Sequence, residues 1–141
     1  MQITKTSDYA LRCVLYLASV SKPAASGEIG TAVLIPKEYV QQILRVLRKK
    51  GLVRSELGAG GGYFLAKPAE QIFLYDVIAP FEKSMYINRC LDKEGCCRWR
   101  DGNIKCPVHI YFMLLQHDIE SSLRKTSIGE LLSSPVYKEG V

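Results

Sequence analysis

The sequence of 141 residues lacks the long apolar runs of a secreted or membrane protein. Residues 1–11, MQITKTSDYAL, contain no uninterrupted apolar stretch of the kind that a signal peptide needs. Residues 9–20 are apolar, but Arg12 interrupts them and they are too short to cross a bilayer. We therefore expect a cytoplasmic protein without a membrane partner. In that reducing compartment, clustered cysteines more often bind a metal or sense redox state than form structural disulfides.

The sequence also lacks the motifs of an enzyme. It contains no recognisable pair of catalytic carboxylates, nucleophile elbow or phosphate-binding loop. The glycine-rich stretch LGAGGGYF is not a phosphate loop, because no Gly-Lys-Ser/Thr follows it and a strand is expected next. Nineteen Lys and Arg residues against fourteen Asp and Glu residues give a net charge of +5, which suits an anionic partner. We expect a binding protein and no enzymatic activity.

Capping and breaking residues predict one helix-rich domain with a single β-hairpin. Ser7 or Asp8 is expected to cap the first helix, and Pro36 to open the third. The segments LVRSE and GYFLA, joined by LGAGG, are typical of a hairpin. Ser127 and Glu130 have the spacing of a capping box. The expected helices span residues 7–20, 27–33, 36–50, 69–81 and 107–125, with a last short helix after Ser127.

The third helix has the pattern of a DNA-recognition helix. Val40, Ile43, Leu44 and Leu47 recur at three- and four-residue spacing and predict a buried stripe. Gln can bind adenine, Arg can bind guanine and Lys can neutralise phosphate, whereas a solvated helix face is the alternative for such a helix on its own. The short helix before it and the glycine-rich hairpin after it favour a winged helix-turn-helix. The candidate DNA-binding residues are Lys37, Glu38, Gln41, Gln42, Arg45 and Arg48 on the helix and Gly60 and Gly61 on the wing.

Three stretches of the sequence resemble the Rrf2 family of bacterial transcription regulators: ITKTSDYALRCVLYLA, YVQQILRVLRKKGLVRSELGAGGGYFLAKP and IFLYDVIAPFE. The resemblance implies a mainly α-helical, dimeric winged helix-turn-helix protein that binds DNA. It also implies a long carboxyl-terminal helix that crosses the same helix of the partner subunit. We expect a DNA-binding domain over residues 1–83 (hairpin about 52–66), a cysteine-rich loop over 84–106, and a dimerisation helix with a short final helix over 107–141.

The long helix itself carries more apolar residues than one packing surface needs. Its main stripe is flanked by Tyr111, Met113 and Leu114, which predicts a second packing surface for a partner helix. A two-fold homodimer would present two recognition helices to a palindromic operator in double-stranded DNA, with half-sites about one helical turn apart. The expected interface residues are Val108, Phe112, Leu115 and Ile119.

Four of the five cysteines lie in residues 90–109, CLDKEGCCRWRDGNIKCPVH. Thiolates bind iron or zinc strongly, and an imidazole can complete the coordination. Resemblance to the IscR branch of the family implies that three cysteines and a histidine, separated from the last cysteine by two residues, hold a [2Fe–2S] cluster. The ligands expected on that basis are Cys90, Cys96, Cys106 and His109, with Cys97 as an alternate for Cys96. Cys13 lies on an apolar helix face and is expected to be buried.

Asp8 is an alternate fourth ligand. The NsrR-like branch of the family places an aspartate here that ligates a [4Fe–4S] cluster from the other subunit. An N-cap would explain Asp8 without any metal. The [2Fe–2S] cluster with His109 is the favoured prediction.

The expected function is a DNA-binding repressor that senses iron–sulfur cluster status, as in IscR-like control of cluster biogenesis. A nitric-oxide or iron sensor of the NsrR or RirA kind is an alternative, as is a cluster-free regulator of cysteine metabolism of the CymR kind. A small iron–sulfur or zinc module of another class would not need the wing and the recognition helix. Leu57 and Glu38 differ from the residues of IscR-like members at these positions, which predicts an altered operator sequence.

Overall fold

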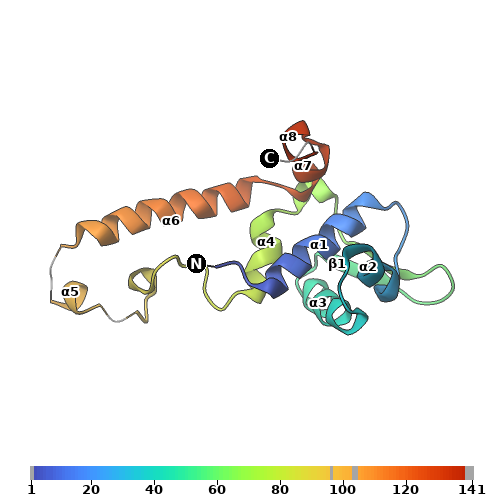
Figure 1. Cartoon of the computed structure of the whole chain (residues 1–141), viewed down its shortest axis with the longest axis horizontal. Helices are drawn as coiled ribbons and strands as arrows, with labels where there is room; N and C mark the ends of the chain where they lie inside the picture. The colour runs from blue at the N-terminus through green and yellow to red at the C-terminus, as the bar shows by residue number, and fades with distance from the viewer. Residues whose placement is uncertain (1, 96, 103–104, 139–141) are drawn as a thin grey trace.

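The first three helices pack around one apolar core and, with the hairpin, form the head of the molecule. The computed structural model describes residues 2–95, 97–102 and 105–138. Cys13 of the first helix, Ile29 of the second and Leu44 of the third meet in this core, each with no exposed surface. The head consists of α1 (Lys5–Ser19), α2 (Ser26–Val33), α3 (Lys37–Lys49), β1 (Val53–Glu56) and β2 (Gly62–Leu65) (Figure 1).

Helix α1 begins earlier than its sequence indicates. Thr4 is the N-cap and accepts a hydrogen bond from the Ser7 amide at 3.3 Å, so the expected N-cap at Ser7 or Asp8 is wrong. The carboxylate of Glu82 accepts from the Thr4 amide at 2.8 Å and also from the Ser7 hydroxyl. Burial alone would raise the pKa of Glu82, but these hydrogen bonds outweigh it and lower that pKa. A distant carboxylate therefore fixes the start of α1.

The buried stripe of α3 is confirmed. Val40, Ile43, Leu44 and Leu47 are at most 1% exposed, while Gln41, Gln42 and Arg45 between them are exposed. The helix ends before Gly51, whose φ of +73° is the left-handed conformation that favours glycine at this position. Local periodicity and the glycine stop were thus sufficient to predict this element.

The wing is a two-stranded antiparallel hairpin in which Val53 pairs with Leu65 and Glu56 with Gly62. Gly58 and Gly60 have φ values of +95° and +76°, which the turn requires. Ala24, between α1 and α2, adds a bridge to β2, because its amide and carbonyl bond to Tyr63 at 2.9 and 2.8 Å. This bridge, which the sequence pattern did not indicate, fixes the wing to the helices.

Residues 69–81 do not form the single helix expected from the sequence. They break into η1 (Ala69–Gln71), α4 (Leu74–Ile78) and η2 (Ala79–Phe81). The break occurs because residues 72–74 pair with a segment more than fifty residues later. The Ile128 amide donates to the Ile72 carbonyl at 2.8 Å, and the Leu74 amide to the Thr126 carbonyl at 3.0 Å. Non-local pairing therefore overrides the local helical pattern.

Helix α6 (Pro107–Lys125) extends away from the head, and the segment that contains η3 (Arg89–Leu91) runs beside it (Figure 1). We call α6 and residues 84–95, 97–102, 105 and 106 the arm. After α6 the chain returns to the head, where Ser127 caps α7 (Ile128–Ser133) as expected and Ile128 is fully buried in the core. The remaining short helices are α5 (Arg98–Asp101) and α8 (Pro135–Lys138). Over the described residues, no helix is both long enough and apolar enough to span a membrane.

Candidate nucleic-acid interface and cysteine loop

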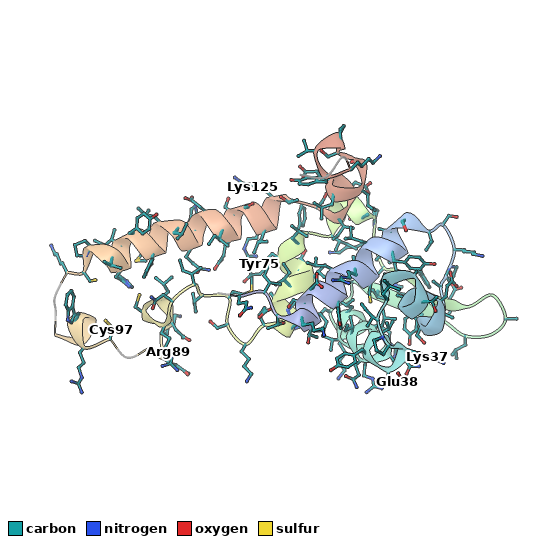
Figure 2. All side chains as sticks on the ribbon, in the orientation of Figure 1. Lys37, Glu38, Tyr75, Arg89, Cys97 and Lys125 are labelled. Carbon is teal, nitrogen blue, oxygen red and sulfur yellow. The ribbon has the colours of Figure 1, made fainter. Side chains whose placement is uncertain are left out.

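The outward face of α3 is polar and mostly basic. Each of the six expected DNA-binding residues on this helix is exposed, and Figure 2 shows Lys37 and Glu38 at the surface of the head. Two of them contact neighbouring elements. Gln41 Nε2 lies 3.4 Å from Ser26 Oγ on α2, and a guanidinium nitrogen of Arg48 donates to Ser55 Oγ on β1 at 3.0 Å. Of the six, Lys37, Glu38, Gln42 and Arg45 make no hydrogen bond to α2 or to β1 among those that we observe.

The tip of the wing is shaped by its glycines and carries an exposed leucine. A Cβ on Gly61 would lie 2.5 Å from the Glu56 carbonyl oxygen, so a larger residue would force the turn open. Leu57 is entirely exposed at this tip. Leu57, Arg48 and Arg54 line a hollow of about 670 Å³ between α3 and the wing. The hollow presents a basic surface beside the recognition helix.

The expected cluster ligands that the structure describes lie on the arm, and Figure 2 shows the alternate ligand Cys97 far from Lys37 of α3. Cys90 lies in η3, where the Asn88 side chain accepts from its amide at 3.1 Å. Cys97 precedes α5, and Cys106 is the N-cap residue of α6. Cys96 lies outside the described residues. The thiol-bearing residues Cys90, Cys97 and Cys106 are all half-buried.

His109 provides the clearest sign of a ligand. Its Nδ1 is buried and, in the described part of the chain, has no hydrogen-bond partner. A buried nitrogen without a partner is costly and calls for an explanation, such as an ion that it ligates. The described residues nevertheless do not bring three His, Cys, Asp or Glu side chains together in a metal-binding arrangement. Thiolate and imidazole donors fit an iron–sulfur cluster. In the described part of the loop, these donor side chains are not gathered around one point.

Asp8 forms an ion pair with Arg12, and Cys13 is buried in the core. Asp8 bonds to Arg12, one turn further along α1, at 2.7 Å, and both side chains are about half exposed. An exposed pair of this kind contributes little to stability, so Asp8 could exchange partners at small cost. Burial raises the pKa of the Cys13 thiol to about 12, which keeps it protonated and excludes it as a thiolate ligand. The expected burial of Cys13 is confirmed.

Gln116 is a residue of the arm that sequence reasoning missed. It is 7% exposed, and its Oε1 accepts from the Ile87 amide at 2.8 Å. Its Nε2 donates to the Met85 carbonyl at 2.9 Å and to Glu120 at 2.8 Å. Gln116 therefore attaches the segment before Cys90 to helix α6. A polar residue within an apolar helix was the signal that could have identified it.

Gln116→Leu is expected to lower the free energy of unfolding by about 1–3 kcal/mol, because the Met85 and Ile87 backbone groups lose the partners that Gln116 provides. Urea unfolding of the purified protein measures this change. His117→Leu, at the next and exposed position of α6, is the matched control and should shift stability by less than about 0.5 kcal/mol. Equal effects of both substitutions would show that Gln116 does not anchor the loop.

The amino-terminal half of α6 exposes a broad apolar surface. Val108 and Leu115 of the expected interface are 55% and 36% exposed, whereas Phe112 and Ile119 are half-buried within the protomer. Large apolar side chains rarely gather on a free surface without a partner. The neighbouring exposed residues are Ile110, Tyr111, Met113 and Leu114.

Comparison with known proteins gives consistent results. The family model described as "Rrf2: Iron-dependent Transcriptional regulator" matches residues 3–134. The HTH-type transcriptional regulator IscR of Xenorhabdus nematophila is 35% identical over 136 residues, which cover 95% of this chain and 80% of that protein. Among solved structures, T. potens IscR is similar with a TM-score of 0.76 at 22% identity, covering 100% of this chain and 93% of the other. CymR, the global cysteine regulator of B. subtilis, has a TM-score of 0.75 at 22% identity, with coverage of 96% and 99%. At these identities the two structures show the winged-helix fold alone.

Proposed function

The chain belongs to the Rrf2 family of transcriptional regulators, and from that premise we propose that it is a DNA-binding repressor that responds to an iron–sulfur cluster. Its relatives are regulators of transcription, which confirms that it is not an enzyme. The observation that carries the DNA-binding part is the arrangement of α3. Its apolar stripe is buried in the head, while its polar and basic side chains project outward between α2 and the wing.

In the proposed complex, α3 lies in the major groove and the wing lies against the neighbouring backbone. Gln42 is exposed on the outward face, where an amide side chain can bond to an adenine edge. Arg48 already bonds to Ser55 of the wing, which holds its guanidinium between the helix and the hairpin. We assign Gln42 to base recognition and Arg48 to the positioning of the wing on the backbone.

Gln42→Ala should weaken binding to the preferred operator by about 1–3 kcal/mol and binding to random duplex DNA much less. The operator is obtained by selection from random duplexes with the wild-type protein, and fluorescence anisotropy at fixed salt measures both affinities. Gln71→Ala is the matched control, since it removes the same side chain at an exposed position in η1, outside α3 and the wing. An equal loss on operator and random DNA would remove Gln42 as a base reader.

The cluster part of the proposal rests on the donors of the arm. Cys90, Cys96, Cys106 and His109 would hold the cluster, with Cys97 and Asp8 as alternates. The unpartnered Nδ1 of His109 and the chemistry of the thiols support this assignment, and the family description as iron-dependent agrees with it. The bound cluster would supply a centre whose loss or oxidation reports cluster status. We favour the two-iron form, because the resemblance of the cysteine and histidine spacing to IscR-like members implies it.

We propose that two copies associate through α6 and bind a palindromic operator. The exposed apolar surface of this helix supports a homodimer, because nothing in the described part of the protomer covers it. A two-fold axis through α6 would place the two heads on successive major grooves. The arm would then connect cluster status to the spacing of the heads.

A further inference from the structure

The flank of α3 that faces away from the wing borders the start of α1, where Lys5 lies. Tyr39 and Gln41 are two residues apart, so they project from opposite sides of the helix. Gln41 approaches Ser26 of α2, whereas the ring of Tyr39 packs edge-on against Tyr9 of α1, with 6.1 Å between the ring centroids. The recognition helix is therefore bordered by α2 on one side and by the start of α1 on the other.

The border with α1 encloses a small hollow with a lysine beside it. The hollow has a volume of about 220 Å³. Lys5 Nζ lies 5.4 Å from the centre of the Tyr9 ring, and Arg12 lies 5.6 Å from it. Arg12 is neutralised by its pair with Asp8, so Lys5 supplies the positive charge here. The hollow is lined by Lys5, Thr6, Tyr9, Pro36 and Tyr39.

We propose that Lys5, with the hydroxyl of Tyr39, binds a backbone phosphate of the DNA strand opposite to the one that meets the wing. A major groove is about 12 Å wide and a helix with its side chains nearly fills it, so phosphates flank an inserted helix on both sides. The wing and α2 account for one side only. On the other side, Lys5 and Tyr39 are the more exposed of the polar residues that line the hollow next to Pro36, at the start of α3.

The stacked arrangement suits a phosphate contact. A lysine held over an aromatic ring loses less side-chain freedom when it binds than a lysine that moves freely in solvent. A phosphate contact carries no sequence information but fixes the register of the recognition helix. The inference rests on the proposed DNA binding and adds a second anchor, on α1, to the wing.

Lys5→Ala is expected to weaken binding about tenfold, to a similar degree on operator and random DNA, because a charge-assisted hydrogen bond is lost. The slope of log affinity against log salt should become less steep by about 0.9 for each Lys5 that contacts DNA. Tyr39→Phe keeps the ring but removes the hydroxyl, and should cost about two- to tenfold. Lys125→Ala, which removes the same charge far from α3, is the control (Figure 2).

Neutral methylphosphonates placed one at a time along the selected operator locate the contact. One substitution should weaken the wild-type protein and leave Lys5→Ala unaffected. The inference is wrong if Lys5→Ala behaves like Lys125→Ala, or if no single phosphate loses its importance in the Lys5 variant. If Gln42→Ala still relaxes specificity in that case, the DNA-binding proposal stands and only the α1 anchor fails. If the wild-type protein selects no duplex, both fail.

Discussion

Leu115→Glu is expected to convert the protein from a dimer into a monomer at micromolar concentration. Leu115 is 36% exposed on α6 and lies among exposed apolar side chains, so a carboxylate there would be buried only when two copies meet. In a two-fold interface each substitution occurs twice, and an uncompensated buried charge costs several kcal/mol. Loss of the second head should lower operator affinity by about 10²-fold or more. Sedimentation velocity and anisotropy measure the two effects.

His117→Glu is the matched control for this experiment. It adds the same charge to α6, but two residues away and hence on the opposite side of the helix, at an exposed position. It should leave both assembly and operator affinity within about twofold of the wild type. Ile119 is less suitable, since it is half-buried in the protomer and its replacement would also disturb folding. A wild-type protein that sediments as a monomer would remove the basis of the palindromic operator.

The elements that sequence analysis predicted correctly are those specified by nearby residues. The stripe of α3 and its glycine stop, the turn of the hairpin and the Ser127 cap all depend on residues that are close together in the sequence. The errors arose where distant residues decide the structure. Glu82 sets the start of α1 from 78 positions away, and hydrogen bonds from residues 126–128 accompany the extended conformation of residues 72 and 73. No local pattern reports such partners.

The candidate sites follow the same division. The face of α3 could be predicted because helical periodicity assigns each side chain to a side. The hollow beside Lys5 and the anchoring role of Gln116 could not, since both depend on elements brought together from distant parts of the chain. The exposed leucine at the wing tip could be named from the sequence, but its orientation toward the basic hollow required the structure.

His109→Ala is expected to remove most of the iron that the wild-type protein retains when it is purified and reconstituted without oxygen. The imidazole Nδ1 is buried without a partner in the described residues, so its ligation would satisfy a costly group, and its removal leaves an open coordination position. Cys106→Ser should have the same result, because serine binds iron poorly compared with a thiolate. Iron and sulfide content and the visible spectrum measure the loss. A wild-type protein that is colourless under these conditions would favour zinc or a cluster-free regulator of the CymR kind.

Asp8→Ala is the discriminating control for the fourth ligand. Because Asp8 bonds to Arg12 on an exposed face and does not cap α1, its removal should leave the absorption bands and the iron content unchanged. Mössbauer spectra then distinguish the expected two-iron cluster from a four-iron cluster. Cys97→Ser should likewise retain iron if Cys96 is the ligand. A four-iron signal that Asp8→Ala abolishes and His109→Ala leaves intact would contradict this assignment. The fourth ligand would then be Asp8, across the subunit boundary. The buried nitrogen of His109 would in that case need a hydrogen bond as its explanation.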